Sequence, residues 1–162
     1  MIRVAILTIS DGCVAGTRQD LSGAALAEAV RKMGWTVTQA ALVPDEIRGI
    51  LLALEDLSGA DVILTTGGTG VAPRDVTPEA TRQFSTREVP GIAEVMRAEG
   101  RKSTRFAALS RGIAVTRGTT LVINLPGSPR GALESLQAVS DLVPHVVDLL
   151  HGRTGHEGKP SS

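Results

Sequence analysis

Several residue types are scarce in this sequence of 162 residues. It has no Tyr, two Phe and one Trp, so the aromatic platforms on which single-stranded nucleic acids stack are nearly excluded. Lys plus Arg and Asp plus Glu both number 17, and this neutral balance argues against nucleic-acid binding driven by charge. A lone Cys13 excludes an internal disulfide bond and fits a reducing compartment.

Long apolar runs and early histidines are also missing. No run reaches the length of a membrane span, and the first 30 residues lack the basic, apolar and cleavage regions of a signal peptide. The three His residues fall within the last 18 positions, which disfavours a Cys/His or Ser/His nucleophile and a metal site built on His. We therefore expect a cytoplasmic protein that binds neither membrane nor nucleic acid and acts on a small molecule.

The first half of the chain alternates strand and helix patterns. Residues 2–9 are almost continuously apolar, as in a parallel strand that is covered on both faces, and a polar loop to about Ser22 follows. Further along, apolar residues spaced three and four apart indicate helices. The order strand, helix, strand, helix, strand predicts an α/β fold with a mostly parallel sheet. The expected elements are strands over 2–9, 35–43 and 61–66, and helices over 21–33 and 45–58.

The second half predicts shorter elements. Pro144 interrupts the last helical region, which should therefore be two helices or one kinked helix. Residues 1–150 are expected to form a single domain, and the polar, glycine-rich residues 151–162 a disordered tail. The expected elements are helices over about 78–84 and 90–99, a helix capped by Ser103 and ending near Leu109, a hairpin of 113–116 and 119–124, and helical structure over 129–150.

The stretch 61–78 joins a buried strand to a glycine-rich turn. The strand residues are apolar or β-branched and stop at Gly67-Gly68-Thr69-Gly70. Glycines permit positive φ angles, so successive backbone N–H groups can face one concavity that suits phosphate. A turn that merely needs flexibility explains the glycines equally well, since such loops are weak motifs. Further along, Thr77 is expected to cap a helix and Pro78 to occupy its first position.

Polar or glycine-rich segments follow four of the predicted strands. In open α/β sheets, ligands bind in the crevice at the carboxyl ends of the strands, so we expect these segments to form one site. The glycine turn and the N-terminus of the helix after Ser128 would each accept an anion. Asp45 and Asp75 supply carboxylates that could hold Mg²⁺ against phosphates. The four segments are Ser10-Asp11, which could equally be a simple turn, Asp45, Gly67–Gly70 and Asn124–Ser128.

The candidate side chains also have structural explanations. Asp45 stands where a helix N-cap belongs, and capping is the more frequent role for an Asp at such a position. Asp75 could form a surface ion pair with Arg74 or Arg82, which would contribute little free energy. Glu94 could lie on a helix surface, and Ser128 is expected to cap a helix first and to contact an anion second. The residues alone leave these alternatives open.

Taken together, the segments resemble the signature of the MogA/MoaB family of molybdenum-cofactor biosynthesis proteins, which is related to the G domains of plant Cnx and animal gephyrin. The main resemblance lies in Thr65-Thr-Gly-Gly-Thr-Gly70 followed by Pro73-Arg-Asp-Val-Thr-Pro-Glu-Ala-Thr81. The resemblance covers about residues 1–150. Further matching pieces are Thr8-Ile-Ser-Asp11, Asp20-Leu-Ser-Gly23, Val43-Pro-Asp-Glu46, Val89-Pro-Gly-Ile-Ala-Glu94, Leu109-Ser-Arg111 and Asn124-Leu-Pro-Gly-Ser128.

The resemblance implies a three-layer α/β/α domain with molybdopterin adenylyltransferase activity. Such an enzyme transfers AMP from MgATP to the phosphate of molybdopterin and releases pyrophosphate. It also implies a homotrimer and allows contact with a molybdenum-insertase partner. Two readings of other classes stay open: a non-catalytic molybdopterin-binding or scaffold paralogue, and an unrelated Mg-nucleotide enzyme that uses the same crevice.

By resemblance, Asp45 and Asp75 are the functionally important acids, as ligands of either Mg²⁺ or the pterin, and the resemblance does not divide these tasks. The glycine turn would cradle phosphate. The residues expected to bind nucleotide or pterin are Ser10, Asp11, Thr66, Gly67, Gly68, Thr69, Gly70, Arg74, Glu94, Ser110, Asn124, Pro126, Gly127 and Ser128.

Overall fold

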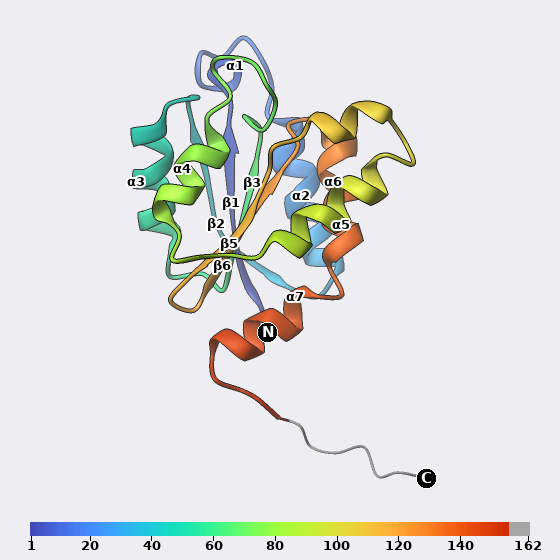
Figure 1. The fold of residues 1–162 in the computed structure, drawn as a ribbon. Coiled ribbons are helices and arrows are strands. Elements are labelled where there is room, and N and C mark those ends of the chain that lie inside the picture. The colour runs from blue at the N-terminus through green and yellow to red at the C-terminus, as the bar shows by residue number, and fades with distance from the viewer. Residues whose placement is uncertain (156–162) are drawn as a thin grey trace.

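The computed structural model describes residues 1–155 as a six-stranded sheet with helices on both faces (Figure 1), which confirms the expected α/β/α fold class. The strand order is β2-β1-β3-β6-β5-β4. The first four strands are parallel, β5 runs antiparallel to β6, and β4 runs antiparallel to β5. The strands are β1 (Arg3–Ile9), β2 (Thr36–Val43), β3 (Val62–Thr66), β4 (Arg87–Glu88), β5 (Ala114–Arg117) and β6 (Thr120–Leu125).

The helices cover the sheet in two layers. Those of one layer, α3 (Ile47–Leu57) and α4 (Thr77–Phe84), pack with Ala5, Leu7 and Ile9 of β1. The other layer packs with Val4 and Ile6 of the same strand, because successive strand residues point to opposite faces. It comprises α2 (Leu21–Lys32), α5 (Pro90–Gly100), α6 (Pro129–Val139) and α7 (Val143–Leu150).

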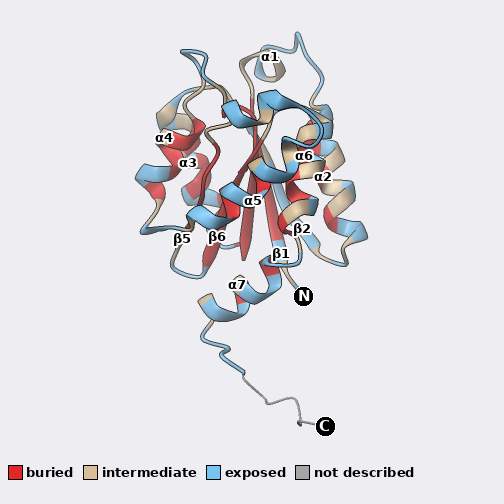
Figure 2. Cartoon of the chain, turned by 45° about the vertical axis from the view of Figure 1, so that its right-hand side comes forward, coloured by how far each residue is buried: buried red, intermediate tan, exposed pale blue. Residues whose placement is uncertain are grey.

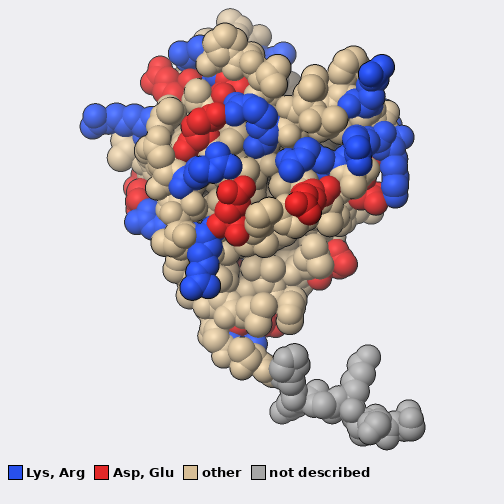
Figure 3. All heavy atoms as spheres, in the orientation of Figure 1, with Lys and Arg blue, Asp and Glu red and all other residues tan. Residues whose placement is uncertain are grey.

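The central strands are buried on both faces, as their continuous apolar sequences predict. Every residue of β3 and β6 is buried, whereas β2 forms the sheet edge and is partly exposed (Figure 2). Acidic and basic side chains are interspersed over the outer face that Figure 3 shows, in keeping with the zero net charge. Within residues 1–155, no helix combines the length and apolar character needed to cross a membrane.

Two short elements, α1 (Asp11–Val14) and β4, were not expected from the sequence. The hydroxyl of Ser10 caps α1 by accepting the Cys13 N–H at 3.2 Å, which makes a helical turn of the expected loop. The helix expected after Ser103 is a 3₁₀ helix, η1 (Arg105–Leu109), and its cap is Thr104. The prediction of Ser103 as cap was wrong, because its hydroxyl donates to Glu134 on α6 instead. The hairpin of β5 and β6 and the division at Pro144 are confirmed.

Asp61, at the start of β3, ties both ends of the described chain to the sheet. Its carboxylate accepts the Arg3 N–H at 2.9 Å and the Arg3 guanidinium at 3.0 and 3.3 Å. His151 Nε2 lies 3.0 Å from the same carboxylate. His151 was expected to belong to a disordered tail but is packed here, while the tail residues 156–162 lie outside the described residues.

These contacts change the proton affinity of Asp61. Burial raises its pKa, but hydrogen bonds from Arg3 and His151 outweigh that effect and lower the pKa from 3.8 to about 2. The depressed pKa contributes stability that is fully present above pH 3.8 and is lost as the pH falls toward 2. Because the Arg3 side chain is half exposed, water screens the Arg3–Asp61 pair. We therefore expect the ionised Asp61 to contribute about 1–2 kcal/mol to the free energy of unfolding.

We predict that Asp61→Asn lowers the free energy of unfolding at pH 7 by about 1–2 kcal/mol. The difference from the wild type should shrink as the pH falls from 4 toward 2, because the wild-type carboxylate is then protonated. Urea unfolding at a series of pH values measures it. Asp56→Asn, at an exposed position on α3, serves as the control and should leave the free energy of unfolding at pH 7 nearly unchanged. A deficit of Asp61→Asn that is independent of pH would contradict the role of the charge.

Candidate active site

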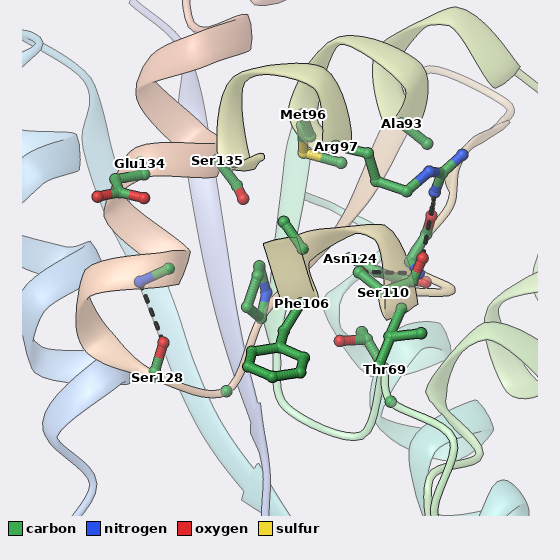
Figure 4. Close-up of a pocket in the computed structure, with 18 of the residues that line it drawn as sticks. Thr69, Ala93, Met96, Arg97, Phe106, Ser110, Asn124, Ser128, Glu134 and Ser135 are labelled. Atoms are coloured by element: carbon green, nitrogen blue, oxygen red, sulfur yellow. Dashed lines mark hydrogen bonds between the residues drawn. The ribbon is translucent and has the colours of Figure 1, made fainter. Parts of the chain in front are cut away.

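Two cavities lie at the carboxyl ends of the parallel strands. The first, of about 450 Å³, is lined by β6 and by parts of α5, η1 and α6 (Figure 4). The second, of about 570 Å³, lies over the ends of β1, β2 and β3. The two cavities share four lining residues, Gly68, Asp75, Gly127 and Ser128, and therefore meet at this rim. The expected convergence of four segments at one sheet edge is confirmed.

The glycine turn after β3 is shaped by close packing. Gly67 and Gly68 have positive φ angles of 102° and 68°. A Cβ atom on Gly67 would lie 2.2 Å from the carbonyl oxygen of Ile9, and one on Gly68 would lie 2.3 Å from the hydroxyl of Thr77. These glycines are therefore required by sterics as well as by φ, and the turn does more than supply flexibility.

Only part of this turn is available to an anion. The N–H of Gly67 donates to the Leu125 carbonyl at 3.2 Å and continues the sheet. The hydrogen bonds of the described residues leave the N–H groups of Gly68, Thr69 and Gly70 without an acceptor. These three residues line the first cavity, so within the turn at positions 67–70 only the last three N–H groups are available to an anion.

Thr77 holds the turn in place, although the sequence predicted a helix cap. It is fully buried as the first residue of α4, whose N-cap is Val76, so Pro78 occupies the second helical position. Its hydroxyl donates to the Gly67 carbonyl at 2.9 Å and its N–H to the Gly68 carbonyl at 3.1 Å. The capping prediction was wrong because Thr77 is itself the first helical residue, and the N-cap position before it belongs to Val76.

Asp45 is likewise not a cap. The N-cap of α3 is Glu46, and Asp45 pairs with Asp11 through reciprocal hydrogen bonds. The Asp11 N–H donates to Asp45 Oδ2 at 2.9 Å, and the Asp45 N–H donates to Asp11 Oδ1 at 3.0 Å. The ends of β1 and β2 are joined in this way. The capping alternative for Asp45 is thereby excluded.

Arg74 binds Asp11 and not Asp75. Its Nε and Nη2 atoms each lie 2.9 Å from a different Asp11 oxygen, and this forked contact lowers the pKa of Asp11. The alternative of an Arg74–Asp75 ion pair was therefore wrong. Asp11 and Arg74 line neither cavity and join the 70–75 loop to the end of β1.

The carboxylates of Asp45 and Asp75 both line the second cavity. Burial raises the pKa of Asp45, and the negative charges of Asp11 and Asp75 raise it further. Hydrogen bonds of the described residues occupy one oxygen of each carboxylate, on Asp45 from Asp11 and on Asp75 from the Ala72 N–H at 3.0 Å. Two neighbouring carboxylates with one spare oxygen each suit a divalent cation.

A protein-only metal centre is absent from residues 1–155, where no cluster of three or more His, Cys, Asp or Glu side chains could hold an ion. Mg²⁺ commonly takes one or two carboxylates and completes its coordination with waters and substrate phosphates. The pair Asp45 and Asp75 therefore fits Mg²⁺ delivered together with a phosphate ligand better than a permanently bound ion.

Comparison with known proteins places this chain in a family. A family model described as a probable molybdopterin binding domain matches residues 5–145. Molybdopterin adenylyltransferase of Helicobacter pylori is 38% identical over 156 residues, which cover 93% of this chain and 89% of that protein. The chain belongs to the MogA/MoaB family.

The structural likeness within the MogA/MoaB family is close. The crystal structure of the molybdopterin biosynthesis enzyme MoaB from Thermus thermophilus has a TM-score of 0.87 and 52% identity, covering 94% of this chain and 98% of that one. The Drosophila melanogaster molybdenum cofactor synthesis protein cinnamon is 44% identical over 153 residues. These cover 92% of this chain and 26% of cinnamon, so the chain spans about a quarter of that protein.

Other residues expected from the MogA/MoaB signature serve the architecture of the site. Asn124 lines the first cavity, but its side chain is buried and its polar atoms bind inside the protein. Its Nδ2 donates to the Thr65 and Thr81 hydroxyls, each at 3.0 Å, and its Oδ1 accepts the Ile113 N–H at 3.2 Å. Asn124 thus fixes β3, α4 and β5 to β6.

The loop after β6 is held in a similar way. The Thr66 hydroxyl donates to the Pro126 carbonyl at 2.7 Å. Ser128 caps α6 by accepting the Gly131 N–H at 3.1 Å, and this confirms its expected first role. The hydroxyl of Ser110 accepts the Gly112 N–H at 3.3 Å and faces the first cavity (Figure 4).

Glu94 lies on the surface of α5. It is exposed and lines neither cavity, while its neighbours Ala93 and Arg97 on α5 line the first. This placement agrees with the helix-surface alternative. The sequence prediction did not include two residues that line the cavities, Arg97 in the first and Asp20 in the second.

The carboxylate of Asp20 accepts hydrogen bonds from the Thr8 hydroxyl at 2.7 Å and from the Gly23 N–H at 2.9 Å. Asp20 begins the matching sequence piece Asp20-Leu-Ser-Gly23, and this resemblance could have identified it as a residue of the cavity.

We predict that Gly67→Ala destabilises the protein by about 3 kcal/mol, because a methyl group at a positive φ would collide with the Ile9 carbonyl. Urea unfolding measures the loss. Gly59→Ala is the matched control, since a Cβ there meets no atom within 4 Å. Equal stability of the two variants would show that the turn can shift to make room.

Proposed function

We propose that this protein is a molybdopterin adenylyltransferase that transfers AMP from MgATP to the terminal phosphate of molybdopterin. The observation that carries the proposal is the shared rim of the two cavities. Two separate volumes that meet at a glycine turn and a carboxylate suit two substrates that must join through their phosphates. The names of relatives that align over most of both chains support the same activity.

In the proposed reaction, a phosphate oxygen of molybdopterin attacks the α-phosphorus of ATP. A new phosphate–phosphate bond forms, the bond to the β-phosphate breaks, and pyrophosphate leaves with the electron pair. The attacking phosphate is already ionised at neutral pH, so no strong general base is required. The absence of His from the lining of both cavities is therefore no obstacle.

The protein would contribute position and charge balance. The N–H groups of Gly68, Thr69 and Gly70 would donate to phosphate oxygens, and the N-terminal end of α6 would face a second anion. Asp45 and Asp75 would hold Mg²⁺ on the side of the second cavity. Bound there with ATP, Mg²⁺ would offset the negative charge that gathers at the α-phosphate.

We also propose that the protein forms a homotrimer, acts in the cytoplasm and passes its product to a molybdenum-insertase partner. The MogA/MoaB membership and the relation to gephyrin support these points. The mass of the assembly in solution, measured by light scattering, tests the trimer. A monomer at the concentrations used for catalysis would exclude the trimer as a requirement.

The direct test is incubation of the protein with molybdopterin and MgATP, followed by detection of pyrophosphate and adenylylated molybdopterin. Formation of both in equal amounts supports the proposal. Tight molybdopterin binding without product would instead indicate the scaffold paralogue. ATP breakdown that does not depend on molybdopterin would indicate an unrelated nucleotide enzyme.

We predict that Asp75→Asn abolishes formation of adenylyl-molybdopterin while the fold and assembly stay intact. The amide can keep the contact with the Ala72 N–H but loses the charge that would hold Mg²⁺. Single-turnover product formation measures the effect, with circular dichroism as the check on folding. Asp141→Asn, at an exposed position between α6 and α7, should retain full activity. Near-normal turnover by Asp75→Asn would contradict the proposed role of Asp75 in holding Mg²⁺.

A further inference from the structure

Arg111, between η1 and β5, forms hydrogen bonds with the loop that carries Asp75. Its Nε donates to the Gly70 carbonyl at 2.7 Å, and its Nη2 donates to the Asp75 carbonyl at 2.7 Å. Its own backbone N–H donates to the Thr69 carbonyl at 2.8 Å. One side chain therefore binds both ends of the 70–75 loop, and the backbone beside it binds the preceding residue of the turn.

The 70–75 loop has little other support. Its residues 71–74 are exposed and bury no side chain in the core. Apart from Arg111, the bonds that hold the loop in the described structure are the turn between Ala72 and Asp75 and the contacts of Arg74 at its outer side. Arg74 binds Asp11 and forms a longer ion pair with Glu46 at 4.0 Å. A free loop of this kind samples many conformations, so a forked donor that fixes both ends removes much of that freedom.

The positive charge of Arg111 is already matched. Its Nη1 forms an ion pair with Glu79 on α4, and this hydrogen bond lowers the pKa of Glu79. Arg111 lines neither cavity, and the atoms it binds on the loop are carbonyl oxygens of the backbone. Its position is that of a residue acting through the loop and not on a substrate.

We propose, on the basis of the adenylyl-transfer function above, that Arg111 is a positioning residue. It fixes the 70–75 loop so that the Asp75 carboxylate and the N–H groups of the glycine turn face the rim where the two cavities meet. Glu79 holds the guanidinium in the orientation that reaches both carbonyls. A displacement of about 1 Å at reacting groups can slow catalysis by about 100-fold, so the gain from this contact is in rate.

The geometry requires Arg in particular. A Lys at this position keeps the positive charge and can still form an ion pair with Glu79. Its single ammonium group, however, cannot bind two carbonyls and a carboxylate at once, as the planar guanidinium does. We therefore expect Arg111→Lys to free one end of the loop. The change separates the geometric contribution of Arg111 from its charge.

We predict that Arg111→Lys lowers kcat by about 10- to 100-fold, with a smaller change in KM for molybdopterin. Hydrogen–deuterium exchange should become faster in residues 70–76 and stay unchanged in β3 and β6. In Arg111→Ala, added guanidinium ion at concentrations too low to unfold the protein should restore part of kcat, because it can occupy the vacated space. It should not rescue Asp75→Asn.

The matched control is Arg117→Lys. Arg117 is similarly exposed, at 41% against 36% for Arg111, and also forms an ion pair, with Glu55, but at the opposite end of the sheet. Arg117→Lys should leave kcat and the exchange of residues 70–76 unchanged. Equal loss of kcat in both Lys variants, or faster exchange of β3 and β6 in Arg111→Lys, would indicate general destabilisation and overturn the proposal.

The exchange measurement also separates this inference from the proposed function. If the wild type forms no adenylyl-molybdopterin but Arg111→Lys still loosens residues 70–76 selectively, the adenylyl-transfer function fails while the loop contact stands. If the wild type is active and Arg111→Lys is equally active with an unchanged loop, the positioning role of Arg111 is wrong and the function stands.

Discussion

The closest packing in the site occurs around Gly67, where the ends of three parallel strands and the start of a helix converge. The carbonyl of Ile9 from β1 leaves no space for a side chain, and a Cβ on Gly127 from the loop after β6 would lie 3.3 Å from Gly67 Cα. Thr77 completes the contact from α4. Because interiors adjust poorly to added volume, this point fixes the glycine turn relative to the end of β1, the loop after β6 and the start of α4.

Charges around the site fall into two groups. Arg74 with Asp11, and Arg111 with Glu79, are matched pairs that hold loops in place and line neither cavity. Within residues 1–155 neither Asp45 nor Asp75 forms an ion pair, although the charge of Arg74 acts on Asp45, and both line the second cavity. The raised pKa of Asp45 reflects this difference, since burial and like charge both oppose its ionisation. A cation brought by a substrate would relieve a repulsion that the fold maintains.

Periodicity of the sequence predicts the parallel strands and the longer helices correctly, because β1 and β3 are buried on both faces and α3 on one. Strand order also predicts that the loops converge, although not the pairing within them. Thr77 and Asp45 fit local capping rules, yet each binds a segment that is distant in the sequence, and such contacts override local preference.

The same limit applies to the site. Arg111 donates hydrogen bonds to three backbone carbonyls more than 30 residues away. It lies in the matching piece Leu109-Ser-Arg111, but the motif does not reveal which atoms it binds. Glu94 was expected in the site by resemblance alone, and in the structure it lies on the exposed face of α5, as the helix-surface alternative predicts. The glycine turn, in contrast, could be predicted because strict steric demands leave few residue choices.

The Asp61 contact has a consequence for how such a domain can be combined with others. It joins the start of β1 to the end of α7 at the amino ends of the parallel strands, on the side of the sheet opposite the cavities (Figure 1). A polypeptide joined to either end would extend away from the rim where the cavities meet and leave both entrances open. The arrangement suits a domain that is joined to others in a longer chain, and this chain aligns with 26% of cinnamon. The effective concentration of one joined module at another would then depend on linker length and not on rebuilding the site.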